Sequence, residues 1–417
     1  MRTQADKPFR LLAAAVVAAL GVAAGVHDAA AQRAGEGEEQ SSGAPTIDAN
    51  TGKVLNEAIE FLNMENYAAA KERLGTLRLD RLSPSERSKV EQILFSIEYA
   101  EEDYNAARGH LQAAIEAGGL NEQEVSAARY QYAQLYMTEE NWQAGAAALE
   151  EWFKTAVNPN SAAYYLLAVA YYQMDQYDKA LEPAKKAVEL MDRPQEGWVS
   201  LLLALYLQRD QYRDAIPLLE RLVAIVPEKK TYWMQLSSVY GQMEDYPRAL
   251  AVMQLAYSAG LVTEDSEIRR LADLLMFNDV PYRGAMVLEK AIADRQVQLD
   301  EKLYEKLANC FIAAGEFDRS LQPLQRAAEL APNGEMFVRL GEVNVQREDW
   351  EGAVAALNRG LEKGQLRDTG KAQLLMGVSL MSQKKWSEAR EWFVRARGSE
   401  QHRQQAAGYI QYIDSQA

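Results

Sequence analysis

The chain has 417 residues, of which 48% are hydrophobic and 25% are charged, as in an ordinary globular protein. Its 45 basic and 60 acidic residues give a net charge of −15, which argues against nucleic acid as a partner. Affinity for a phosphate backbone comes from Lys and Arg, which are in deficit here. Three histidines and one cysteine, Cys310, are too few for a zinc site built from His and Cys and allow no internal disulfide. We therefore expect no metal and no cofactor.

The first residues, 1–31, have the three parts of an export signal: a basic start, an apolar run over 11–26 and small residues at 29–31. The alternative is an uncleaved anchor helix, for which the apolar run is short and rich in Ala. Residues 32–50 are heavy in Gly, Ser and Glu, lack apolar periodicity, and are expected to form a flexible leader. We expect an exported, periplasmic protein of a Gram-negative envelope, with no transmembrane segment once the signal is removed.

An internal repeat organises residues 51–398. Its mark is an aromatic residue, a small residue three positions later and an apolar residue four further on, as in Tyr104, Ala107 and Leu111. The small residues of the ten copies, which lie 33 to 38 positions apart, are Ala70, Ala107, Gly145, Ala180, Ala215, Ala249, Gly284, Ser320, Ala353 and Ala389. Twelve positions before each lies a second residue, usually small or apolar. We expect these two positions to face each other across a pair of closely packed helices.

The pattern resembles the tetratricopeptide repeat, and one copy shows it well, with Trp233, Leu236, Tyr240, Ala249 and Ala256. The resemblance implies an all-α, right-handed α-solenoid of about ten helix pairs, each with a first helix (A) and a second helix (B). No single pair buries its apolar face alone, so stacking is expected to build one continuous core. The segment 399–417 suits a C-terminal capping helix, with Tyr409, Ile410 and Ile413 on one side.

The seventh copy departs from the pattern, because Asn278-Asp279-Val280-Pro281 replaces the usual acidic–aromatic turn. This departure is compatible either with drift within a tolerant repeat or with a joint near 278–284.

No motif supports catalysis. Cys310 falls between core positions of a helix, which is typical of a packed apolar residue. The stretch Gly364 to Lys371 mimics a phosphate loop, but it has one residue too many between its glycines, and Ala372 occupies the place of the Ser or Thr that binds magnesium. Carboxylates are numerous but lie at turns and helix ends. We expect a protein that is not an enzyme.

In tetratricopeptide folds, helix A lines a concave groove, and the resemblance indicates which positions would be exposed there. In copies three to six these positions carry no charge, and Tyr, Met and Gln suit recognition of a peptide or a partner helix. The predicted groove residues are Tyr130, Gln131, Gln134, Tyr165, Val169, Tyr172, Leu207, Gln208, Met234, Gln235, Ser238 and Gln242. Leu166, Val169 and Leu201 are equally compatible with the core. In later copies the same positions are charged or polar and could steer a polar segment: Arg269, Arg270, Lys306, Asn309 and Arg339.

Residues 54–108 also resemble the start of periplasmic repeat proteins encoded beside TonB–ExbB–ExbD energy-transducing modules, most clearly at Leu82-Ser83-Pro84-Ser85-Glu86-Arg87. This resemblance implies a scaffold accessory to TonB-dependent transport, with a TonB-, ExbB- or ExbD-type protein or an outer-membrane receptor as partner. Two alternatives stay open: a scaffold for cell-wall or secretion machinery, and a carrier of a glycan or small molecule.

Overall fold

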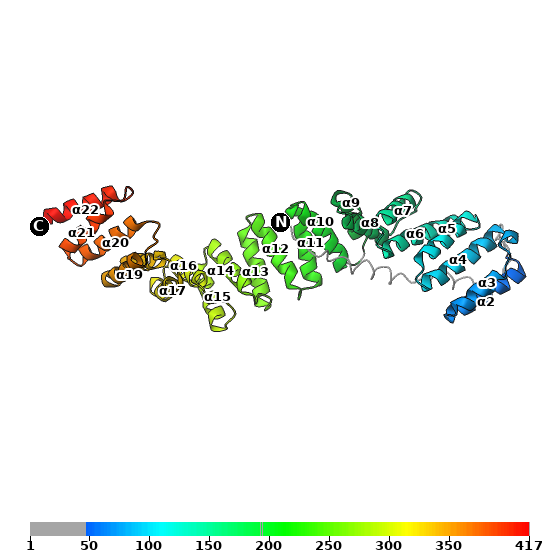
Figure 1. Ribbon diagram of the computed structural model, residues 1–417, viewed down its shortest axis with the longest axis horizontal. Coiled ribbons are helices and arrows are strands. Elements are labelled where there is room, and N and C mark those ends of the chain that lie inside the picture. Colours follow the sequence, from blue (N-terminus) through cyan, green and yellow to red (C-terminus); the bar gives the residue numbers. More distant parts are fainter. Residues whose placement is uncertain (1–46, 192, 194, 417) are drawn as a thin grey trace. The chain divides into compact units, whose positions relative to one another are not determined.

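The computed structural model describes residues 47–191, 193 and 195–416, and these form α-helices joined by short turns, one short 3₁₀ helix, and no strands (Figure 1). The predicted export signal, 1–31, and most of the predicted leader lie outside the described residues. The first helices in chain order are α2 Ala49–Asn63, α3 Tyr67–Gly75, the 3₁₀ helix η2 Leu79–Arg81, α4 Pro84–Ala100, α5 Tyr104–Glu116, α6 Glu122–Thr138, α7 Trp142–Phe153, α8 Ser161–Gln173, α9 Tyr177–Glu189, α10 Glu196–Gln208 and α11 Tyr212–Ile225. The rest are α12 Lys230–Gln242, α13 Tyr246–Ser258, α14 Asp265–Phe277, α15 Pro281–Ala293, α16 Glu301–Ala313, α17 Phe317–Leu330, α18 Glu335–Gln346, α19 Trp350–Lys363, α20 Thr369–Ser382, α21 Trp386–Ala396 and α22 Arg403–Gln416.

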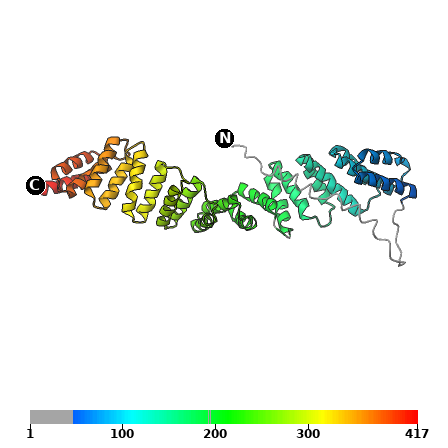
Figure 2. The same cartoon turned by 90° about the horizontal axis from the view of Figure 1, so that it is seen from below.

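Consecutive helices pack as pairs, in the manner of a tetratricopeptide solenoid, so the predicted all-α fold is confirmed. The even-numbered members, α2 to α20, are the A helices, and each is followed by its B helix. Contacts divide the described residues into two compact units, one that ends at Leu218 and one that begins at Leu219, with the boundary inside α11. Within each unit, Figure 2 shows the successive pairs stacked side by side.

The turn inside every pair follows one rule. The residue two positions before each B helix has a positive φ, between 55° and 75°, in all ten pairs. It is Gly315 in the eighth pair and a charged residue, such as Glu102 or Asp279, in the others. The next residue often caps helix B; Asp103, for example, accepts a hydrogen bond from the N–H of Ala106 at 2.9 Å. The predicted turn before each aromatic position therefore coincides with a left-handed residue followed by a helix cap.

The predicted small positions pack where the two helices of a pair meet. All ten are buried, and so are their partners twelve residues earlier. In the sixth pair the hydroxyl of Ser237 donates to the carbonyl of Ala249 at 2.9 Å, which shows directly that these two positions face each other. A Cβ added at Gly341 would lie 2.6 Å from the side chain of Leu357, so even one extra carbon would collide there.

The end of the second unit matches the predicted cap. Ile410 and Ile413 of α22 are buried, and Tyr409 stacks on Phe393 with ring centroids 4.8 Å apart. At the other end, α2 begins at Ala49, so the last residues of the predicted leader lie in this helix. No helix in the described part of the chain has both the length and the apolar character needed to cross a bilayer.

The seventh pair, α14 and α15, forms in the ordinary way, with Asp279 in the left-handed turn position and Pro281 as the first residue of α15. The boundary between the two compact units lies elsewhere, at Leu218 and Leu219. A joint near 278–284 stays a prediction.

Candidate functional site

Three A helices of the first unit, α6, α8 and α10, carry the uncharged positions of the predicted groove, but part of this groove belongs to the core. Tyr165 is only 1% exposed, and its ring stacks on Trp198 of α10 with centroids 4.7 Å apart. Val169 is 3% exposed. The expectation that Tyr165 and Val169 are open to a partner is therefore wrong. Both belong to the buried core of the first unit, as Leu166 and Leu201 also do.

Burial has a further effect on Tyr165. It raises the pKa of the phenol to about 12, so the side chain stays neutral. Its hydroxyl has no hydrogen-bond partner among the described residues. The packing of the ring between α8 and α10 must therefore offset the cost of an unpaired buried hydroxyl.

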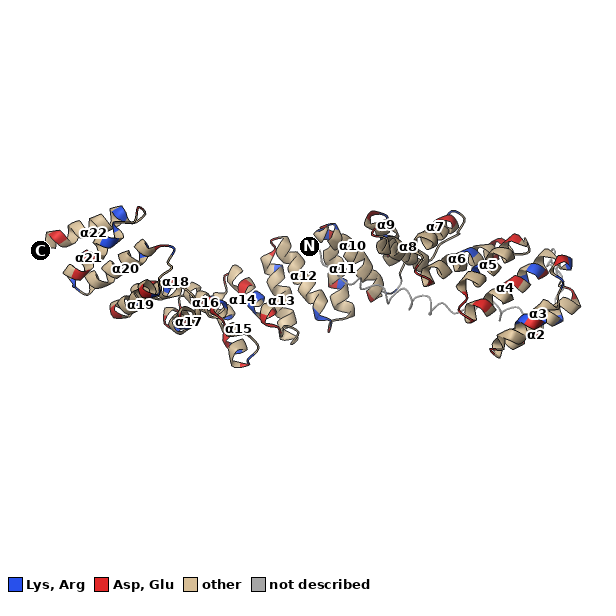
Figure 3. Ribbon diagram, in the orientation of Figure 1, with Lys and Arg blue, Asp and Glu red and all other residues tan. Residues whose placement is uncertain are grey.

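The other predicted positions of this unit remain accessible. Gln208 is exposed, and Tyr130, Gln131, Gln134, Tyr172 and Leu207 are half-buried. We call Gln131, Gln134, Tyr172, Leu207 and Gln208 the unit 1 A-face. Two of the three helices that carry it are nearly free of charge, because α8 has no Asp, Glu, Lys or Arg and α10 has only Glu196 (Figure 3). Amide side chains beside apolar ones can bond a backbone and cover apolar groups at once.

The A helices of the second unit start in the same way. On α12, Met234, Gln235 and Ser238 are half-buried and Gln242 is exposed. Farther along the chain the equivalent positions become charged, as predicted, but most of these charges are already paired.

Most of the predicted steering residues form ion pairs between neighbouring A helices. Arg269 of α14 binds Asp300, at the start of α16, at 2.9 Å, and it also binds Asp265 at 2.6 Å. Burial alone would raise the pKa of Asp300, but the hydrogen bonds from Arg269 and from the Leu303 N–H lower it overall. Lys306 bonds Asp273.

Further bonds between A helices follow along the second unit. Arg339 bonds Glu305 at 3.0 Å and also Asn309, and Lys371 of α20 bonds Glu342 of α18. Arg270 forms no ion pair with any described residue. Four of the five predicted steering residues, all except Arg270, thus hold helices together, although binding by any of them stays a prediction.

The groups considered for chemistry are packed or paired. Cys310 is fully buried, and burial raises the pKa of its thiol to about 11, which disfavours the reactive thiolate. His110 contacts Glu91 at 2.6 Å, and His402 contacts Asp368 at 2.8 Å. Within the described ranges no three His, Cys, Asp or Glu residues are arranged to hold a metal ion.

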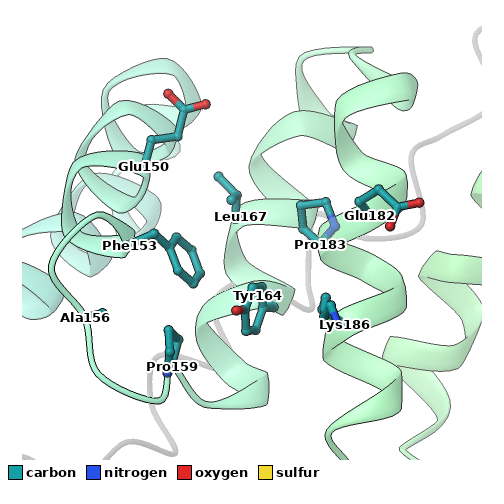
Figure 4. Close-up of a pocket in the computed structure, with 9 residues that line it drawn as sticks. All are labelled: Glu150, Phe153, Ala156, Pro159, Tyr164, Leu167, Glu182, Pro183 and Lys186. Atoms are coloured by element: carbon teal, nitrogen blue, oxygen red, sulfur yellow. The ribbon is translucent and has the colours of Figure 1, made fainter.

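Sequence reasoning missed a hollow of about 540 Å³ in the first unit, lined by α7, α8 and α9 (Figure 4). Its walls are Phe153, Ala156, Pro159, Tyr164, Leu167 and Pro183, with Glu150, Glu182 and Lys186 around them. The sequence signal was weak, because a repeat pattern marks the positions that pack and does not mark gaps between B helices.

Sequence comparison agrees with this architecture. A family model described as the tetratricopeptide repeat matches residues 133–194, 203–260 and 338–406. None of the curated protein sequences is significantly similar to the chain.

Among solved structures, a tetratricopeptide repeat protein from Parabacteroides merdae matches with 12% identity and a TM-score of 0.34, covering 71% of this chain and 99% of that one. The MamA protein matches with 18% identity and a TM-score of 0.37, covering 43% of this chain and 96% of that one. The Cut9–Hcn1 hetero-tetramer of the APC/C matches with 12% identity and a TM-score of 0.30, covering 87% of this chain and 84% of that one. With TM-scores this low, none of these structures identifies a binding site or a partner of this protein.

The fold defines an all-helical repeat protein in which pairs of helices stack. Over the matched residues the chain contains tetratricopeptide repeats.

Proposed function

We propose that this protein is a non-enzymatic scaffold that binds another protein through the unit 1 A-face. The observation that carries the proposal is the contrast between α6, α8 and α10 and the A helices from α14 onward. From α14 onward, charged A-helix positions form ion pairs between helices, whereas α6, α8 and α10 leave Gln131, Gln134 and Gln208 accessible beside Tyr172 and Leu207. Such a surface can bury apolar groups of a partner without stripping water from charges.

We further propose that the scaffold works in the periplasm, in support of TonB-dependent transport. The location is supported by the basic start, apolar run and small residues of 1–31. The transport role is supported by the resemblance of residues 54–108 alone. In the structure its most recognisable part starts a helix: Ser83 caps α4 in a capping box with Glu86, and Pro84 is the first helical residue. That segment therefore also has a purely structural reason to exist.

The test is co-purification from cells that produce the protein, after separation of periplasmic and membrane fractions. The wild type is compared with the variant Gln131→Glu/Gln134→Glu, which adds charge to the A-face. A variant with Gln143→Glu, an exposed position on α7, is the control for charge alone. We expect the wild type and the control to recover a TonB-, ExbB- or ExbD-type protein or an outer-membrane receptor, and the A-face variant to lose it.

Other outcomes would redirect or contradict the proposal. Recovery of cell-wall or secretion components instead would overturn the transport role and support the alternative scaffold. Equal recovery by all three folded proteins would show that the A-face is not the binding surface.

A further inference from the structure

The hollow between α7, α8 and α9 lies on a different side of α8 from the unit 1 A-face. Tyr164 and Leu167 point into the hollow, as Figure 4 shows, whereas Tyr172 belongs to the A-face. At 3.6 residues per turn, Tyr172 lies roughly 110° around the helix from the direction midway between Tyr164 and Leu167. The hollow is therefore a second surface, and the proposed function does not use it.

Its lining suits a large apolar side chain. Phe153 and Tyr164 form a tilted aromatic pair with centroids 4.8 Å apart, and Leu167 and Pro183 continue the apolar wall. A volume of about 540 Å³ lies within the range of about 300–1,000 Å³ that is usual for ligand sites. Val157, in the same α7–α8 connection as Ala156 and Pro159, is 86% exposed, so uncovered apolar surface continues beside the hollow.

The charges around the hollow are not equally neutralised. Lys185 pairs with Glu182 at 2.8 Å, and Lys186 pairs with Glu189 at 3.6 Å. Among the described residues, no basic side chain forms an ion pair with Glu150, whose hydrogen bond comes from the neutral hydroxyl of Tyr171. Burial and this bond raise the pKa of Tyr171 to about 12, so the phenol brings no charge to the carboxylate.

We infer that this hollow is a docking site for a segment of a partner protein that carries a large apolar side chain next to Lys or Arg. The apolar side chain enters between Phe153 and Pro183, and the basic side chain bonds the Glu150 carboxylate at the edge of the hollow. Charge complementarity favours a basic neighbour, because Glu150 is the lining charge without an opposite charge paired to it. This inference does not depend on the A-face being a binding surface.

The experiment titrates the full chain with a fluorescently labelled hexapeptide of Gly and Ser that has Trp-Arg at its centre. A second peptide has Trp-Gln, and a third has Ala-Arg. Ala156→Trp fills the hollow, and the control Val157→Trp places the same ring on the adjacent exposed residue. Glu150→Gln removes the charge while keeping an acceptor for Tyr171, and Glu151→Gln is its control on an exposed neighbour.

We expect the Trp-Arg peptide to bind at least tenfold more tightly than either other peptide. Ala156→Trp is expected to abolish binding and Val157→Trp to leave it unchanged. Glu150→Gln is expected to lower the affinity for the Trp-Arg peptide about tenfold, to the affinity that the wild type has for the Trp-Gln peptide. The affinity of Glu150→Gln for the Trp-Gln peptide is expected to equal that of the wild type. Glu151→Gln is expected to change the affinity for neither peptide.

Binding that survives Ala156→Trp would overturn the site, and equal affinity for the Trp-Arg and Trp-Gln peptides would overturn the role of Glu150. No binding of the Trp-Arg peptide to the wild type would overturn the inference as a whole. The A-face variant Gln131→Glu/Gln134→Glu is expected to bind this peptide as the wild type does. Loss of peptide binding to the hollow can therefore be told apart from loss of partner binding to the A-face.

Discussion

Glu86 joins the first two helix pairs through one buried carboxylate. It accepts hydrogen bonds from the N–H of Asp48 at 2.9 Å and from the N–H and hydroxyl of Ser83 at 2.8 Å each. Asp48 caps α2 and Ser83 caps α4, so a single side chain fixes the starts of both helices. The hydrogen bonds from Ser83 and Asp48 hold the pKa of Glu86 below its usual value despite burial.

Replacing this carboxylate tests its role and gives a pH dependence. A group whose folded pKa is lowered stabilises the fold above its ordinary pKa of 4.5, and the contribution is lost as the pH falls through the folded pKa. We expect Glu86→Gln to cost about 2 kcal/mol near pH 7, with the difference from wild type shrinking below pH 4.5. Urea unfolding from pH 7 to pH 3 measures this. If the difference in unfolding free energy between the wild type and Glu86→Gln did not change with pH, Glu86 would not be the charged group that stabilises this contact.

At the scale of elements, the turn inside each helix pair shows what the repeat demands of the backbone. Nine of the ten left-handed positions are occupied by residues with a side chain, and only Gly315 avoids the steric cost. Because this position is set by the tight turn, the cost recurs from pair to pair.

The turn makes opposite predictions for two neighbouring pairs. Glu348→Gly relieves the left-handed strain at φ 59° and is expected to stabilise the protein by about 0.5–1 kcal/mol. Gly315→Glu, at φ 75° with open space around it, is expected to destabilise it by a similar amount. Thermal and urea unfolding of both variants measure the shifts, and shifts of the same sign would contradict the turn rule.

The ion pairs between A helices make a prediction about Arg269, which is expected to support structure. Its side chain is 15% exposed and bonds Asp265, Asp300 and the carbonyl of Gln298, so Arg269→Gln is expected to cost about 1–2 kcal/mol. Lys154→Gln, which breaks a solvent-exposed pair with Glu151, is expected to change the stability far less than Arg269→Gln does. Urea unfolding compares the two, and equal costs would contradict a structural role for Arg269.

The sequence revealed the packing of elements far better than the accessibility of single residues. The small positions recur because every pair needs close contact between its helices, and each lies where the pattern placed it. Tyr165 was misplaced because the stacking partner, Trp198, lies one repeat farther along and follows no repeat rule. The charges at Arg269 and Arg339 were visible, but their partners on the next or previous helix pair, Asp300 and Glu305, are about 30 residues away and were recognisable only in space.

For the whole molecule, stacking of pairs implies that stability is local, because each pair contacts mainly its neighbours. Phe393 is fully buried at the end of the second unit, against Tyr409 and beside Gly377. We expect Phe393→Ala, which removes a buried ring, to cost about 3–5 kcal/mol locally. Hydrogen exchange should then accelerate in α20 to α22 and stay unchanged in α2 to α9. Uniform acceleration throughout the described helices would show that the stack unfolds as one cooperative block.

The central claim is that the unit 1 A-face is the working surface of the scaffold, and in-cell photocrosslinking tests it most directly. A photoreactive residue is placed at Gln134 on α6 and, in a separate strain, at the exposed Gln143 on α7. We predict that Gln134 captures a discrete envelope protein of the TonB-dependent transport system, and that the capture is absent at Gln143. Capture of nothing at Gln134, with the protein folded and abundant, would contradict the account, as would capture of the same protein at both positions.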